Sequence, residues 1–146
     1  MKILSQTSTA LLGLLAGGSL LIAIGLVPYW QSLNPEDFTR VFSDSMPTLG
    51  GTMAVLTILG TVSIIIAAAI ATWRKLPNKS WLLASAVNIL VMISTLPFYF
   101  GSANPLLVSG TLSADATLAE LTTWGQVHWF RTVVGIIGFF CAVRAA

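Results

Sequence analysis

Long apolar stretches alternate with short polar segments along the whole chain. Four of the stretches are long enough to cross a bilayer, because about 20 helical residues span a hydrocarbon core of about 30 Å. They run from about Ser8 to Pro28, Leu49 to Trp73, Trp81 to Phe100 and Gly125 to Val143. The pattern predicts an all-α integral membrane protein, with residues 1–146 forming one four-helix transmembrane domain.

The polar segment between the second and third stretches is short, residues 74–80. A connection of this length favours an antiparallel helix pair, so the simplest topology is an antiparallel four-transmembrane-helix bundle. Small residues allow helices to approach closely in lipid. Gly13 and Gly17 on the first stretch, with Gly135 and Gly138 on the fourth, are therefore expected to serve packing within the bundle.

The first outer segment has its own helix signals. Asn34 is a typical N-cap, Pro35 suits the first helical position, and two acidic residues follow in the first turn. Phe38 and Phe42 are then spaced for one helix face, and Met46–Pro47 is expected to end the helix. We predict a short amphipathic helix here, either anchored at the interface or acting as a lid over the bundle mouth.

The second outer segment is less regular. Pro97 is expected to kink or end the third helix, and the stretch from Gly101 to Pro105 has turn-forming residues. Ser113 is a candidate N-cap for a helix that leads into the fourth span. That helix is predicted either to run straight through or to bend near Gly125.

Composition and charge support this interpretation and orient the chain. Hydrophobic residues make up 55% of the sequence and charged residues 8%, against about 25% charged in soluble domains. Lys2, the basic loop at 74–79 and Arg144 would share one side of the membrane, with all five acidic residues and Arg40 on the other. The positive-inside rule therefore predicts that both termini are cytoplasmic. No basic stripe suggests nucleic-acid binding.

Few residues offer cofactor chemistry. Cys141 is the single cysteine and His128 the single histidine. An internal disulfide and a bis-histidine haem within one chain are therefore excluded. The clustered His, Cys and carboxylate ligands typical of zinc or di-metal sites are also missing, so we predict no metal and no cofactor.

The strongest functional signal lies at the start of the fourth span. Glu120, Trp124, His128 and Arg131 fall on one helix face. An arginine at this depth costs about 2.5–3.5 kcal/mol on insertion scales, and no span contains an acidic residue to offset it. Its counter-charge would come from outer-loop acids, from backbone carbonyls or from an anionic ligand. Arg131 is thus predicted either to tie an outer loop to the bundle or to bind a ligand.

His128 also has two interpretations at this stage. It is either a hydrogen-bonded structural histidine or a proton-transfer group, because its ordinary pKa lies near neutrality. In the functional interpretation, His128 and Arg131 are the catalytic candidates, and Trp124 and Glu120 are the substrate-binding candidates.

Short motifs near the ends of the spans carry a family resemblance. They are Pro28 with Leu33–Phe38 and Phe42, Pro97 with Asn104 and Leu107, and Trp124-Gly-Gln-Val-His-Trp-Phe-Arg-Thr132. Together they resemble the anthrone oxygenase family of four-span membrane proteins, whose fourth helix has the pattern W-x-x-x-N-x-x-R-T. His128 stands where asparagine is common in that pattern.

The resemblance implies oxidation of an anthrone-like aromatic ketone by molecular oxygen, without a metal or flavin. His128 would then remove a proton, Arg131 would stabilise the resulting enolate, and Trp124 would stack on the aromatic substrate.

Two other function classes remain open from the sequence. One is a non-catalytic protein, either an accessory subunit of a larger membrane complex or a lipid- or quinone-binding module. Its partners would be the subunits of that complex or further copies of this chain, and Trp73, Trp81 and Trp129 would supply its aromatic surfaces. The other is a small transporter, which is disfavoured because the two halves of the chain show no convincing repeat.

Overall fold

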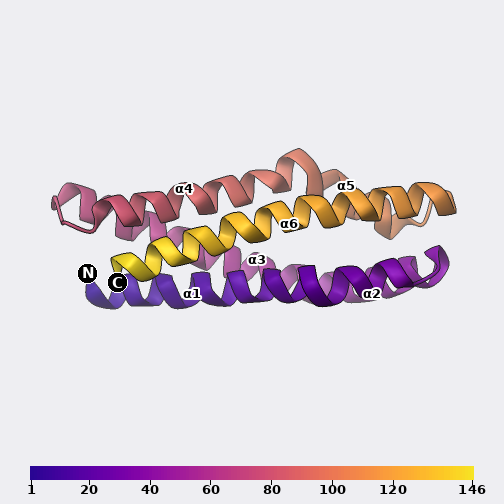
Figure 1. Ribbon diagram of the computed structural model, residues 1–146, viewed down its shortest axis with the longest axis horizontal. Coiled ribbons are helices and arrows are strands. Elements are labelled where there is room, and N and C mark those ends of the chain that lie inside the picture. The colour runs from indigo at the N-terminus through magenta and orange to yellow at the C-terminus, as the bar shows by residue number, and fades with distance from the viewer.

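Four helical rods joined by short connections make up the computed structural model, which describes residues 1–146 (Figure 1). The first and third rods are each interrupted by one wider π-helical turn. The elements in chain order are α1 (Lys2–Leu21), η1 (Ile22–Leu26), α2 (Val27–Ser32), α3 (Pro35–Trp73), α4 (Lys79–Thr95), η2 (Leu96–Phe100), α5 (Gly101–Ser109) and α6 (Ala114–Ala145).

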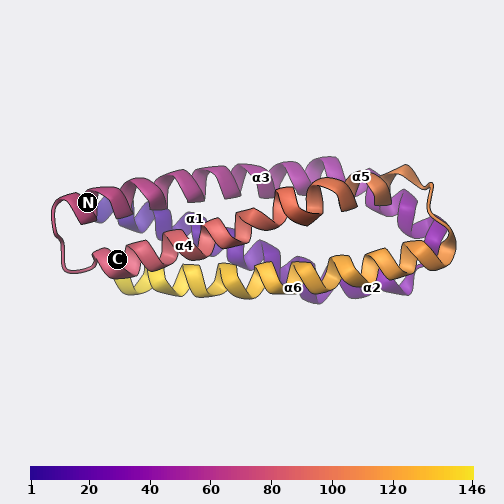
Figure 2. The same cartoon turned by 90° about the horizontal axis from the view of Figure 1, so that it is seen from above.

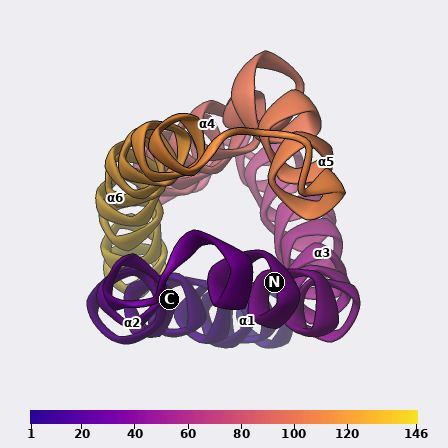
Figure 3. The ribbon, with the colours of Figure 1, turned by 90° about the vertical axis from the view of Figure 1, so that its right-hand side faces the viewer.

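The rods lie side by side along one long axis. The chain reverses at alternating ends, so that consecutive rods run in opposite directions and both termini lie at the same end (Figures 1 and 2). Viewed down the axis, the α1–α2 rod is flanked by α3 and α6, and the α4–α5 rod lies across from it, between the same two helices (Figure 3).

All four rods are long and apolar enough to cross a membrane, which confirms the number of candidate spans. They contain 31, 39, 31 and 32 residues, so at about 1.5 Å per residue they are about 46–59 Å long. Large apolar side chains cover their outer surfaces; Ile58, Phe98 and Phe140 are 61%, 85% and 59% exposed. Such a surface is stable in lipid and unfavourable in water.

The predicted helix start at Asn34 is confirmed, but its predicted end at Pro47 is not. The Asn34 side chain accepts a hydrogen bond from the Asp37 backbone N–H at 2.9 Å. The helix then continues through Pro47 to Trp73 as α3, so this segment is no separate surface helix. Phe38 and Phe42 are 1% and 0% exposed, so the part of α3 before the proline is packed in the bundle core and not on its surface.

Helical structure also persists where turns were expected after α4. A proline cannot donate the N–H of an ordinary helical turn, and a π-helical turn accommodates that loss. Pro97 lies inside η2, and Pro28 follows η1 by two residues. Beyond η2 the chain forms α5, although Gly101–Pro105 was expected to be irregular. The Ser113 cap is confirmed, and α6 runs through Gly125 without interruption.

The core has two parts along the axis. Near the termini, small and aliphatic residues pack closely, including Leu15, Ala67 and Ala142. Toward the opposite end, the core is aromatic and includes Trp30 and Trp124. The predicted close packing is seen at Gly138 in the first part, but the prediction was wrong for Gly17, where nothing lies within 4 Å of a Cβ atom. A Cβ atom at Gly138 would lie 3.2 Å from Asn88 Cβ, and the Ser85 hydroxyl donates to the Gly138 carbonyl at 2.7 Å.

Substituting Gly138 with leucine should therefore force α4 and α6 apart. We expect Gly138→Leu to lower the free energy of unfolding by about 1–3 kcal/mol or more, as in other overpacked cores. Gly17→Leu is the matched control, because nothing lies within 4 Å of a Cβ atom at Gly17. Thermal unfolding in lipid nanodiscs measures both. Equal stability of the two variants would contradict the packing role of Gly138.

Candidate functional site

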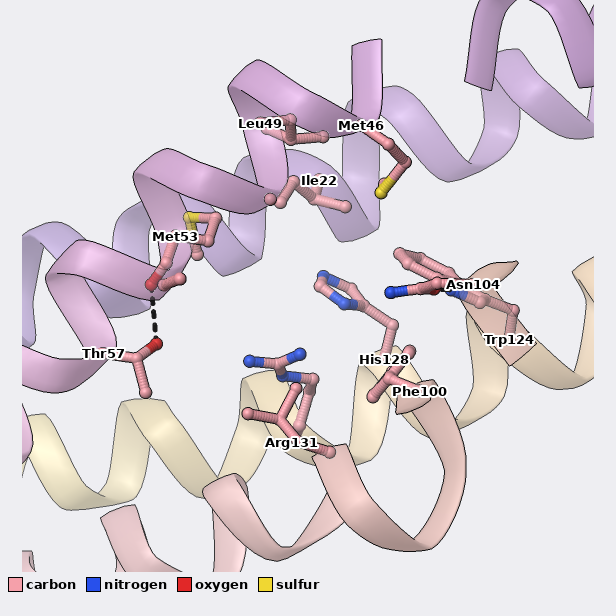
Figure 4. A pocket seen from close by; sticks show the side chains of 13 residues that line it. Ile22, Met46, Leu49, Met53, Thr57, Phe100, Asn104, Trp124, His128 and Arg131 are labelled. Carbon is pink, nitrogen blue, oxygen red and sulfur yellow. Dashed lines mark hydrogen bonds between the residues drawn. The ribbon is translucent and has the colours of Figure 1, made fainter. Parts of the chain in front are cut away.

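A cavity of about 140 Å³ lies between α3, α6 and the two π-helical turns (Figure 4). Most of its wall is apolar, and its polar groups come from a few side chains. The lining residues are Ile22, Met46, Leu49, Gly50, Met53, Ala54, Thr57, Leu96, Phe100, Asn104, Trp124, His128 and Arg131. Three of the four site residues predicted from sequence, Trp124, His128 and Arg131, are thus brought together on one cavity wall.

His128 is held by a contact across to the first rod. Its Nε2 lies 3.0 Å from the Ser19 carbonyl oxygen. A carbonyl only accepts, so Nε2 carries the proton and donates. The other ring nitrogen, Nδ1, is buried and has no hydrogen-bond partner. In the neutral ring this nitrogen is an unprotonated acceptor, available to a group inside the cavity.

Arg131 is buried, 8% exposed, without any acidic partner. The single salt bridge in the structure joins Arg40 to Asp37 on the surface. The guanidinium makes no hydrogen bond to the protein, and its buried Nε is unpaired. Its Cζ lies 5.0 Å from the centre of the Phe100 ring. A cation–π contact contributes about 0.5–2 kcal/mol, less than the cost of burying the charge.

Aromatic contacts fix the orientation of Trp124 and His128. The two rings stack with centroids 4.9 Å apart and planes 10° apart. The Trp124 indole N–H donates to Asn104 Oδ1 at 2.7 Å, which joins α6 to α5. Phe100 packs edge-on against Trp124, with centroids 5.2 Å apart. These contacts connect the α6 side of the site to α5 and η2.

Glu120, the fourth predicted site residue, does not line the cavity. Its carboxylate accepts a hydrogen bond from the Tyr99 hydroxyl at 2.7 Å. The residue lies one helical turn before Trp124, and its partner Tyr99 belongs to η2. Glu120 consequently ties two elements together, and it neither lines the cavity nor forms a salt bridge with Arg131.

The cavity is closed toward the end of the bundle that carries residues 33–34 and is open to one side. Trp30, Phe38 and Phe42 fill that end and are at most 1% exposed. Among the lining residues, those exposed at the surface include Gly50 and Ala54 on α3 and Leu96 on η2. The opening therefore lies between α3 and η2, on the lateral face of the bundle.

Several lining residues were missed by the sequence analysis. Phe100 was named only as the end of the third apolar stretch and Asn104 only as part of the family motif, and neither Met46 nor Met53 was a site candidate. Asn104 had a usable signal, because a polar residue after an apolar span is a candidate for capping or binding. The methionines had none, since their spacing on α3 is the same for a cavity wall and for an ordinary core.

Comparisons of the chain with protein-family models, with curated proteins and with solved structures find no match. The geometry of this cavity is therefore the main evidence for a function.

Proposed function

We propose that this chain is a multi-pass membrane protein that binds an apolar, oxygen-bearing aromatic molecule in the Arg131 cavity and oxidises it with molecular oxygen. One observation carries the proposal. A buried guanidinium and a buried imidazole acceptor, both unpaired in the protein, line the same apolar cavity. Intramembrane ionisable groups without internal partners mark binding or reaction sites.

The membrane arrangement that accompanies this proposal is an antiparallel four-helix transmembrane bundle with both termini cytoplasmic. Its support is the distribution of lysine and arginine. Lys2, the loop with Arg74 and Lys79, and Arg144 lie at one end of the bundle, and Glu36 and Asp37 lie at the other. By the positive-inside rule, the end with the basic residues is cytoplasmic. The cavity then lies in the outer half of the membrane.

The proposed reaction converts an activated CH₂ group of an aromatic ketone into a carbonyl group. His128 Nδ1 accepts a proton from the CH₂ carbon, and the Arg131 guanidinium stabilises the enolate oxygen that forms. The enolate carbon adds O₂ as the oxidant, and loss of water from the resulting hydroperoxide leaves the quinone-type carbonyl. In total, CH₂ and O₂ give C=O and H₂O. This is the chemistry that the resemblance to anthrone oxygenases implies.

Turnover of anthrone in nanodiscs, followed by anthraquinone formation and oxygen consumption, tests the proposal. We expect His128→Ala to reduce kcat by about 10²–10⁴-fold, the usual contribution of a positioned base. Arg131→Gln should reduce it by about 10²–10³-fold, as for loss of an oxyanion donor. Trp129→Phe is the control, because Trp129 is 42% exposed on the opposite face of α6.

Unchanged turnover in both cavity variants would refute this reaction. Tight binding of aromatic molecules without any turnover would instead favour a quinone- or lipid-binding module. The apolar wall of the cavity, which includes Ile22, Met53 and Phe100, suits a quinone or a lipid equally well.

A further inference from the structure

We infer that the cavity receives its ligand sideways from the bilayer, and that it holds one hydroxyl-bearing aromatic ring whose apolar remainder stays between α3 and η2. The ligand class is a membrane-soluble phenol or enol with an apolar tail or additional rings. This inference deepens the proposed function, since it concerns the same cavity, but it requires binding only and no oxidation.

The polar groups of the cavity are complementary to a hydroxyl group. Arg131 offers donors, and His128 Nδ1 offers an acceptor, because Nε2 is committed to the Ser19 carbonyl. A phenol or enol oxygen satisfies both at once: its O–H donates to Nδ1, and its lone pairs accept from the guanidinium. An ether has no hydrogen to donate, and a hydrocarbon ring leaves both protein groups unpaired.

The size of the cavity limits what fits inside. A closed apolar cavity of about 150 Å³ holds one benzene ring. The volume here is about 140 Å³, so one ring fits between the Trp124 side and the methionines of α3. The remainder of a larger molecule must extend through the opening.

The position of the opening determines where that remainder lies. Gly50 and Ala54 leave the α3 side of the opening without bulky side chains, and Leu96 forms the opposite rim at 37% exposure. The exposed residues next to the opening are strongly apolar, with Ile58 on α3 at 61% and Phe98 on η2 at 85%. A route through this belt leads into lipid, whereas the buried aromatic residues described above block the route along the bundle axis.

Equilibrium binding of tritiated para-nonylphenol to the protein in phosphatidylcholine nanodiscs tests the inference, with empty nanodiscs as background. We expect saturable binding, weakened about 10- to 100-fold in Arg131→Gln, as for loss of a charged hydrogen bond. The methyl ether of the same probe should show a similar loss. Thermal unfolding of each variant verifies that it is folded.

A pair of neighbouring substitutions tests the route. Ala54→Trp should fill the opening and slow association of para-nonylphenol at least about tenfold, the equivalent of a 1.4 kcal/mol change. Val55→Trp adds the same side chain one residue away, at a position that does not line the cavity. Equal association rates in the two variants, or equal binding of the phenol and its methyl ether, would overturn the inference.

These outcomes are separate from those for the proposed function. Binding that depends on the hydroxyl and on Ala54, without anthrone turnover, would retain this inference and refute the oxygenase. Anthrone turnover that Ala54→Trp does not change would support the oxygenase and refute entry of the ligand through this opening.

Discussion

Replacing Trp30 with alanine is expected to lower the free energy of unfolding by about 3–5 kcal/mol, the range for large aromatic residues in cores. Trp30 is 1% exposed and lies at the centre of the aromatic part of the core. Its ring contacts Phe42 and Trp124 edge-on, with centroids 5.1 and 5.5 Å away. These pairs join α2, α3 and α6, so the loss would loosen three elements at once.

Trp73→Ala is the matched control, because Trp73 is 80% exposed at the other end of α3. Its removal should change the unfolding free energy by no more than about 0.5 kcal/mol. Thermal and denaturant unfolding in nanodiscs provide the measurement. Similar stability of the two tryptophan variants would mean that the aromatic cluster does not hold this end of the bundle.

Replacing Arg131 with methionine is expected to stabilise the ligand-free protein while abolishing ligand binding. The guanidinium has no acidic partner and no hydrogen bond to the protein, so only the cation–π contact with Phe100 offsets the cost of its burial. A methionine of similar length would remove that cost, and we expect a gain of about 2 kcal/mol, near the insertion penalty of a central arginine. Such opposition of stability and function is typical of binding sites.

Unfolding of Arg131→Met without ligand, compared with Arg74→Met in the exposed loop, measures this effect. Arg74 is outside the bundle, and its substitution should be nearly neutral. A clear loss of stability in Arg131→Met would restore the alternative that the arginine is a structural tie. It would also remove the main support for a ligand in this cavity.

Local signals predicted the helices well and their ends less well. Four apolar stretches correspond to the four rods, and the N-caps at Asn34 and Ser113 form as expected. The predicted breaks at Pro47 and Gly101 were wrong. A proline costs one hydrogen bond locally, but buried Phe38 and the wider turn η2 allow the chain to remain helical. At these positions, the energy of packing outweighed the local preference of the chain to end the helix.

Helical periodicity also placed Trp124, His128 and Arg131 on one face, and burial of all three confirms that face. Glu120 belongs to the same face by periodicity, yet it pairs with Tyr99 outside the cavity. Periodicity gives direction around one helix only. It does not say which neighbouring rod lies opposite each turn.

The sequence by itself determined the number of membrane-competent helices and the unusual buried arginine, because both depend on hydropathy and spacing within one segment. Only the tertiary structure decided that Arg131 has no counter-charge, that the Ser19 carbonyl leaves His128 Nδ1 as an acceptor, and that the cavity opens between α3 and η2. These properties depend on distances between rods that are far apart in sequence, and they are set by how the side chains of all four rods pack together.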